Sequence, residues 1–262
     1  EMDFIFCAIG KDAIENYLAS DGLPIAISTA YKGDKGIENV IANRDGRVYG
    51  TVVPELRLQG VTSNYSSSGY STLKFLNEQF KNDQMGTSYV NTTDAPIIRY
   101  GEVLVNYAEA CVELGTLTQD DLDKSINKLR ARVGVNLPKL EVVGGQPAVN
   151  GKVYDDPNRD QSVSSLIWEI RRERRSELIF EGFRLNDLRR WKKLEYADTD
   201  KKPSINLGAF VDKTKWSADQ LKTITLTPEG YIIPSIVGRT VLDKHYLEPI
   251  PLDQIALYKA NG

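Results

Sequence analysis

The stretch from Ile170 to Trp191, IRRERRSELIFEGFRLNDLRRW, constrains the fold more than any other part of this 262-residue chain. Apolar residues recur at helical spacing within this stretch and just before it. Because a helix turns by about 100° per residue, these residues share one helix face. These residues are Leu166, Ile167, Ile170, Leu185, Leu188 and Trp191. Five charged residues fall on the same face, namely Glu173, Arg174, Glu177, Glu181 and Arg184. The pattern predicts one long helix over 164–193 whose buried face carries charges at its centre.

Charges that leave water must be paired, because an unpaired buried ion costs several kcal/mol. Arg174 and Glu177 are three residues apart, as are Glu181 and Arg184, and side chains at this spacing meet on a helix surface. We therefore predict a structural charge network made of Glu173, Arg174, Glu177, Glu181 and Arg184. It would be paired largely within the helix, with further cations opposite the glutamates.

The same stretch could be mistaken for a nucleic-acid-binding arm or for a catalytic site. Nine lysines or arginines stand against four acidic residues between 171 and 193, but the acids are interspersed and the whole chain carries a net charge of −3. A phosphate-binding surface needs a basic solvent face, so we expect no nucleic acid partner. Glu177 and Glu181 would both stay ionised beside arginines, so neither could be the acid of a glycosidase.

Other residue types also narrow the chemistry. His245 is the only histidine, which argues against most zinc sites, the Ser-His-Asp triad and the Cys-His pair. We expect no catalytic residue, no metal and no cofactor, and hence no enzyme. Cys7 and Cys111 lie far apart and are expected to be free core thiols. No apolar run approaches the roughly 18 residues of a membrane span.

A helical hairpin is predicted over residues 96–134. Apolar residues recur at steps of three and four from Ile97 to Cys111, and Gly115 follows as a stop. Thr118 can cap the next helix, with Asp121 three residues later in a near capping box.

The remaining parts of the chain are less regular. Residues 1–95 are rich in turn signals, 135–161 form a surface excursion, 162–194 hold the long helix, and 195–262 are again rich in loops. We expect a single domain over 1–262 of mainly α class, with extensive irregular loops and a few short strands.

At the level of motifs, the charged helix resembles the signature helix of the SusD/RagB-like family, ERR-x-EL-x-FEG-x-R-x-x-DL-x-RW. Four further segments are similar to that family in the same order: Asn43–Arg47, Ser68–Leu76, Ile98–Ala110 continuing to Arg130–Gly134, and Tyr246–Pro251. Gly46 departs from the pattern, because the family has a proline there. The family's first helical repeats and its lipid-anchoring cysteine have no counterpart, so the chain resembles the C-terminal part of a member.

The resemblance implies tetratricopeptide-like helix pairs and a non-catalytic protein of the outer membrane. Such a protein is lipid-anchored on the extracellular face of a Bacteroidetes-type cell, and the anchor is absent from this chain. It captures oligosaccharides or polysaccharides for uptake through a partner SusC-like TonB-dependent transporter. Two alternatives stay open: a peptide-capturing member of the same family, and a helical-repeat scaffold that binds proteins and has no ligand of its own.

The motifs of the family do not include its ligand residues, so the ligand site rests on aromatic residues in predicted loops. Sugar rings pack on aromatic faces while nearby polar groups bind their hydroxyls. The candidates are Tyr31, Tyr65, Tyr70 and Trp216. Trp168, Trp191, Tyr100 and Tyr107 lie on predicted helices with apolar periodicity, and we assign these four to the core.

Overall fold

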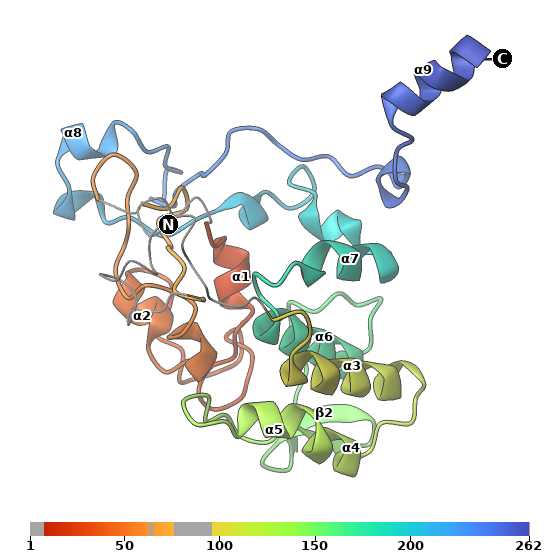
Figure 1. Cartoon of the computed structure of the whole chain (residues 1–262). Coiled ribbons are helices and arrows are strands. Elements are labelled where there is room, and N and C mark those ends of the chain that lie inside the picture. Colours follow the sequence, from red (N-terminus) through yellow and green to blue (C-terminus); the bar gives the residue numbers. More distant parts are fainter. Residues whose placement is uncertain (1–7, 63–64, 76–95, 262) are drawn as a thin grey trace, which may run out of the picture.

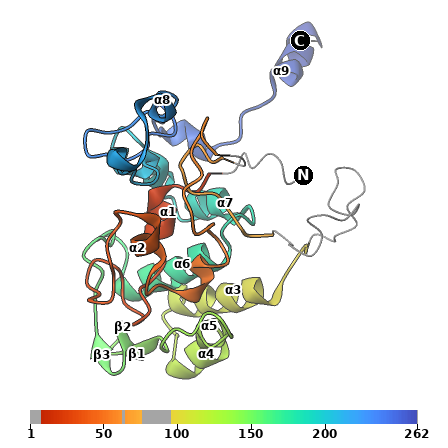
Figure 2. The ribbon, with the colours of Figure 1, turned by 90° about the vertical axis from the view of Figure 1, so that its left-hand side faces the viewer.

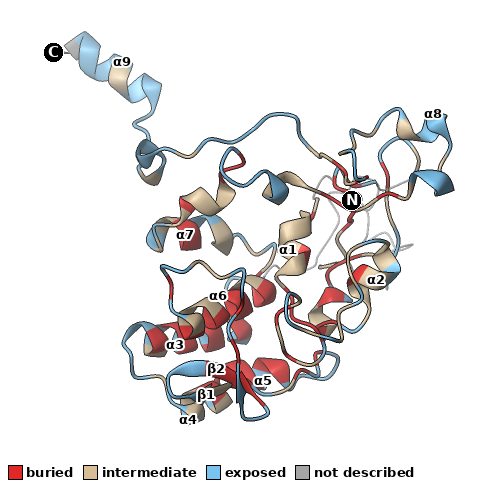
Figure 3. Cartoon of the chain, turned by 180° about the vertical axis from the view of Figure 1, so that it is seen from behind, coloured by how far each residue is buried: buried red, intermediate tan, exposed pale blue. Residues whose placement is uncertain are grey.

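Two long helices, α3 (Tyr100–Glu113) and α6 (Ser165–Glu177), lie side by side at the centre of the computed structural model of the chain (Figure 1). The structure describes residues 8–62, 65–75 and 96–261. α4 (Gln119–Lys124) and α5 (Ile126–Arg130) pack against α3. Side chains of these four helices, together with Leu140 and Leu178, form the first core cluster: Leu104, Val105, Ala108, Val112, Leu122, Ile126, Leu129, Leu140, Leu166, Ile170 and Leu178. Buried residues concentrate where these helices meet (Figure 3). The prediction of a mainly helical chain is confirmed.

The helical hairpin is confirmed, with one break in its second helix. α3 ends before Gly115, whose φ of +70° suits a glycine at a helix end. Thr118 and Asp121 form a full capping box: the Thr118 hydroxyl accepts from the Asp121 amide at 3.2 Å, and the Asp121 carboxylate accepts from the Thr118 amide at 2.9 Å. Ser125, with φ −124° and ψ −94°, separates α4 from α5.

The surface excursion is a folded antiparallel meander whose middle strand is buried. β1 (Glu141–Val143) pairs with β2 (Gln146–Val149), which pairs with β3 (Lys152–Val153). Both turns have two residues with positive φ, which suits Gly144–Gly145 and Asn150–Gly151. β2 packs against α6, so this part of the chain covers the core.

A second core forms with little regular structure. Its buried residues come from both ends of the chain: Ile9, Ile14, Val40, Val52, Leu58, Tyr70, Ala209, Val211 and Ile232. The short elements around it are α1 (Lys11–Glu15), α2 (Ile37–Ile41), α8 (Ala218–Leu221) and the 3-10 helices Gly46–Val48, Pro203–Asn206 and Lys213–Lys215. The 3-10 helices Leu194–Ala197 and Asp243–Tyr246 follow α7 (Phe183–Arg190) in the chain. The terminal helix α9 (Leu252–Asn261) projects away from the rest (Figures 1 and 2).

The prediction of one continuous helix over 164–193 is wrong. α6 ends at Glu177, and α7 (Phe183–Arg190) begins after a turn in which Phe180 and Gly182 have φ of +63° and +83°. The break changes which side chains are buried. Leu188 is buried as expected, but Leu185 is 53% exposed.

Cations from distant segments explain where α6 ends. Lys74 Nζ donates to the carbonyl oxygens of Glu177 and Ile179 at 3.1 and 2.8 Å, and Arg99 Nη2 donates to that of Glu177 at 2.6 Å. Carbonyls of the last helical turn lack partners within the helix, and positive side chains suit that end of the helix dipole. Gly182 then allows the left-handed turn into α7.

The predicted charge network exists, but its glutamates are paired with cations from other segments rather than within the helix. Glu177 accepts from Arg47, Arg99 and Arg132 at 3.2, 2.6 and 2.6 Å. Glu173 accepts from Arg47 and from Arg130 Nε at 2.9 and 2.6 Å. Glu181 accepts from Lys74 and Arg99, both at 2.6 Å.

The two predicted arginines of the network have other roles. Arg174 joins α6 to α7 and α3, because it donates to Asp187 at 2.7 Å and to Asn106 at 2.5 Å. Arg184 lies apart from Glu181, and among the described residues it makes no hydrogen bond or ion pair. The predicted pairs are therefore wrong. Arg174 turns to Asp187 and Asn106 instead of Glu177, and the turn at 178–182 breaks the helical spacing that the pair Glu181–Arg184 assumes.

Glu177 is the most heavily paired carboxylate of this network. Its side chain is 2% exposed, and burial alone would raise its pKa. The charges and hydrogen bonds of Arg47, Arg99 and Arg132 outweigh burial and lower the pKa from 4.5 to about 2. The carboxylate is therefore ionised wherever the protein is folded near neutral pH.

Replacing Glu177 should destabilise the protein strongly. We expect Glu177→Ala to lower the free energy of unfolding by about 3–5 kcal/mol, because the cations around it lose their partner in a buried site. Urea unfolding measures the change. Glu248→Ala is the control, since Glu248 pairs with Arg189 and is 75% exposed, and it should cost less than about 1 kcal/mol. A loss below about 1 kcal/mol for Glu177→Ala would contradict the burial argument.

The stability that Glu177 contributes should depend on pH. Because its folded pKa is depressed, this contribution is complete above the unfolded pKa of 4.5 and is lost as pH falls toward about 2. Unfolding of wild type and Glu177→Gln at several pH values should show a stability difference that shrinks across this window. A difference that stays constant from pH 6 to pH 2.5 would refute the assignment.

Gly46 should not tolerate a side chain, although the family's pattern has a proline at that position. A Cβ atom there would lie 1.5 Å from the Gly134 carbonyl oxygen. We expect Gly46→Ala to destabilise by about 1–3 kcal/mol through overpacking, measured by urea unfolding. Gly50→Ala is the control, because its Cβ would meet only the Arg47 carbonyl at 3.8 Å. Equal effects of the two variants would count against the close approach.

Candidate functional site

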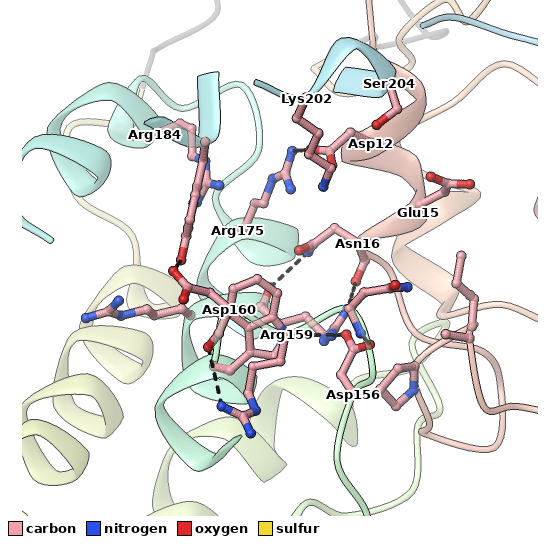
Figure 4. A pocket seen from close by; sticks show the side chains of 18 of the residues that line it. Asp12, Glu15, Asn16, Asp156, Arg159, Asp160, Arg175, Arg184, Lys202 and Ser204 are labelled. Atoms are coloured by element: carbon pink, nitrogen blue, oxygen red, sulfur yellow. Dashed lines mark hydrogen bonds and ion pairs between the residues drawn. The ribbon is translucent and has the colours of Figure 1, made fainter. Parts of the chain in front are cut away.

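A pocket of about 670 Å³ lies between α1, α6, α7 and the loops near residues 25 and 158 (Figure 4). Its volume is within the range of roughly 300–1,000 Å³ that is typical of small-molecule sites. Four aromatic side chains line it: Tyr31, Trp168, Trp191 and Tyr196. Charged side chains of both signs make up much of the remaining wall. The site therefore combines ring faces with polar groups.

Trp168 on α6 and Tyr196 in the 3-10 helix after α7 form an aromatic pair. Their rings meet edge to face, with centroids 6.2 Å apart and planes at 77°. Trp168 Nε1 donates to Asp156 at 3.2 Å, and the Tyr196 hydroxyl donates to Asp160 at 2.5 Å. Each ring is thus held by a hydrogen bond and keeps part of its surface exposed to the pocket.

Trp191 contributes to the wall in a different way. Arg171 and Arg190 stack on its ring, with Cζ atoms 4.5 and 4.9 Å from the centroid. Its Nε1 donates to Glu109 on α3 at 2.6 Å. The ring therefore joins α7 to α3, and arginines occupy its surface.

The carboxylates of the wall are paired with cations. Asp156 accepts from Arg172, and Asp160 accepts from Lys193 at 2.7 Å. Burial alone would raise the pKa of Asp160, but the hydrogen bonds from Lys193 and Tyr196 hold it below the ordinary value of 3.8. Such an ionised carboxylate accepts hydrogen bonds and does not supply a proton at neutral pH.

A group of cations lies along one side of the pocket. Figure 4 shows Arg175, Arg184 and Lys202 there, with Asp12 among them. Arg175 Nη2 lies 2.6 Å and Lys202 Nζ lies 3.6 Å from Asp12. Burial opposes ionisation of Asp12, but Arg175, Lys202 and Arg184 together lower its pKa.

The four aromatic residues predicted as ligand contacts do not form one site. Tyr31 lines the pocket, where its ring also meets the Arg44 guanidinium at 5.2 Å. Tyr65 is 42% exposed and lies outside the pocket. Trp216 is partly buried against the second core. Tyr70 is only 2% exposed within that core, so its nomination as a ligand contact is corrected.

The assignment of four helical aromatics to the core is also wrong. Trp168 and Trp191 line the pocket, while Tyr100 and Tyr107 on α3 are 63% and 42% exposed. The spacing of residues in the sequence could have indicated that Trp168 lies outside the core. Trp168, Arg171, Arg172 and Arg175 recur at steps of three and four, which marks a second helix face that is both aromatic and basic.

A smaller hollow of about 350 Å³ lies beside the serine-rich loop. Its lining includes Ser66, Ser67 and the segment from Thr223 to Thr225, and among the described residues no aromatic ring faces it. It offers hydroxyl groups without a stacking surface, so the larger pocket is the better site for a ring-shaped ligand.

Several predicted absences concern metals, thiols and membranes. Across residues 8–62, 65–75 and 96–261, no cluster of three or more His, Cys, Asp or Glu residues could hold a metal ion. The same ranges contain no helix of the length and hydrophobicity needed to span a bilayer. Cys111 is a free, partly buried thiol, and Cys7 lies outside the described residues.

Comparison with known proteins places the chain in a family. Solved structures with a similar fold include a SusD-like carbohydrate-binding protein from Bacteroides fragilis, with 24% identity and a TM-score of 0.65 over 95% of this chain and 47% of that one. A second SusD-like protein from the same species has 24% identity and a TM-score of 0.59 over 95% of this chain and 45% of that one. The chain thus spans about half the length of these relatives. No curated protein matches it. Residues 5–260 match the SusD family, and the chain belongs to that family.

Proposed function

We propose that this protein binds glycans at the cell surface and does not turn them over. The observation that carries the proposal is the pocket in which Trp168 and Tyr196 are held by hydrogen bonds beside charged side chains. Such a site suits the apolar face and the hydroxyl groups of a sugar ring. Membership of the SusD family supports it, as does a solved relative that is described as a carbohydrate-binding protein.

The cellular setting that we propose follows from the family resemblance. The protein would capture oligosaccharide or polysaccharide on the extracellular face of the outer membrane, held there by a lipid anchor. A SusC-like TonB-dependent transporter would take the glycan up. The helical hairpin of α3 with α4 and α5, and the pair α6 and α7, would be tetratricopeptide-like units of a longer repeat scaffold.

A protein-binding scaffold is the second candidate, because α3 has an exposed apolar face. Tyr100, Val103 and Tyr107 lie on it and are 63%, 49% and 42% exposed. Such a face is typical of a surface that packs against another element or another protein.

Peptide capture is the other alternative. The charged side chains that line the pocket could bind the termini of a peptide.

Truncating Trp168 should weaken glycan binding. Affinity electrophoresis and calorimetry over a polysaccharide panel should find at least one ligand with no product formed, and Trp168→Ala should weaken it about tenfold, or about 1.4 kcal/mol. Trp168→Phe keeps a ring for stacking and should retain most of the affinity. Its retention would show that the loss in Trp168→Ala does not come from the lost hydrogen bond to Asp156.

Tyr65→Ala is the matched control, because Tyr65 is an exposed aromatic residue outside the pocket. Its affinity should equal that of wild type. If the whole panel fails to bind, the proposed function is wrong. If Tyr65→Ala loses binding and Trp168→Ala does not, the ligand site lies on the serine-rich loop instead.

A further inference from the structure

The cations on one side of the pocket outnumber the carboxylates that could pair with them. Asp12 is the partner of both Arg175 and Lys202, at 2.6 and 3.6 Å, and neither cation has another ion pair among the described residues. Arg184 lies near the same group, since its charge acts on Asp12. Three cations therefore share one carboxylate.

Arg184 is the unusual member of this group. In the described part of the chain it has no hydrogen bond and no ion pair, and its one aromatic contact is Trp191, whose ring centroid lies 5.8 Å from Cζ. Burial and the nearby charge of Arg175 lower its pKa from 12.5 to about 9, so it is still positive at neutral pH. Its side chain is partly buried, so water compensates the charge only in part.

Neither acid near Arg184 is free to neutralise it. Asp12 is held by Arg175, and Asp187 is held by Arg174 at 2.7 Å and by Arg190 at 2.9 Å. The other carboxylates that line the pocket also have cations of their own: Glu15 pairs with Lys11, Asp156 pairs with Arg172, and Asp160 and Glu195 share Lys193. Within the residues that the structure describes, the wall therefore leaves positive charge uncompensated around Arg184.

A folding role does not account for this arrangement. Placing two guanidinium groups and an ammonium group around the single carboxylate of Asp12 opposes folding, because like charges repel and desolvation disfavours each of them. The buried side chains of Arg47, Arg130 and Arg174, by contrast, are each paired with a carboxylate. Uncompensated charge that opposes stability is typical of a binding site.

We propose that Arg175, Arg184 and Lys202 bind the anionic group of an acidic sugar, a carboxylate or a sulfate ester, whose ring packs on the Trp168–Tyr196 pair. Guanidinium groups suit such ligands because their planar donors bind two oxygens of a carboxylate or sulfate at once. This inference deepens the proposed function and rests on it: the glycan that enters the pocket is negatively charged.

The test compares acidic and neutral polysaccharides on the same protein. Polygalacturonate supplies the carboxylate, carrageenan supplies the sulfate ester, and neutral galactan supplies neither. Wild type should bind at least one of the acidic polymers at least tenfold more tightly than galactan, and the preference should shrink as salt rises. Which acidic polymer binds identifies the anionic group.

Arg184→Gln should weaken acidic-glycan binding by about 10- to 100-fold, as expected for a charged hydrogen-bond partner. Arg184→Lys should restore part of it. The control is Arg189→Gln, which removes the same charge from the same helix outside the pocket and should bind like wild type. Thermal melting adds a second readout, since Arg184→Gln should melt at the temperature of wild type or above it.

Four results would overturn the inference. Galactan could bind as tightly as the acidic polymers, with Trp168→Ala still weakening it, and then the proposed function would stand while the anionic ligand would not. Equal losses in Arg184→Gln and Arg189→Gln would mean diffuse attraction rather than a site. A lower melting temperature for Arg184→Gln would assign Arg184 to the fold. Tight binding of a peptide mixture with no glycan bound would reject both proposals.

Discussion

Three glutamates are the constraint on which the rest of the structure depends: Glu173 and Glu177 in the last turns of α6, and Glu181 in the turn that follows it. Their carboxylates are removed from water or nearly so, and the cations that neutralise them come from far apart in the sequence: Arg47, Lys74, Arg99, Arg130 and Arg132. A buried carboxylate without its partner costs several kcal/mol, so these segments must come together for the chain to fold. Loops that have little secondary structure are thereby fixed in place.

This network also explains why the family's motifs are scattered. Three of the four further segments that resemble the family supply part of it: Arg47 from the first, Lys74 from the second, and Arg99 with Arg130 and Arg132 from the third. The conserved-looking strings are therefore the two sides of one set of ion pairs. They describe mainly how the scaffold holds together, although the signature helix also supplies Arg175, Arg184 and Trp191 to the wall of the pocket.

Periodicity and caps predicted the local structure well wherever local forces decide it. The helix before Gly115 and the capping box at Thr118 depend on residues within a few positions of each other, and both are present. The end of α6 depends on Lys74 and Arg99, each more than 75 residues away in sequence. The helical pattern contains no trace of these contacts, and it therefore predicted that the helix continues through 178–182.

The ligand site was harder to predict, for a related reason. A tyrosine in a serine-rich loop suggests exposure, yet Tyr70 fills the second core because segments from the two ends of the chain close over it. Trp168 sits on a helix with an apolar face, which suggests a core residue. Its side chain instead faces a space that α1 and the 3-10 helix after α7 enclose, and neither contact is visible in the pattern of α6 itself.

The two faces of α6 have a consequence for how such proteins diversify. At about 100° per residue, Trp168 and Arg175 lie on nearly the same side, and Glu173 and Glu177 lie roughly 140–180° away from Trp168. The carboxylates that hold the scaffold together are thus separated from the side chains that line the pocket. Substitutions of Trp168 or Arg175 leave the ion pairs of Glu173 and Glu177 intact, so one helix can keep its scaffold contacts while its opposite face is adapted to different ligands.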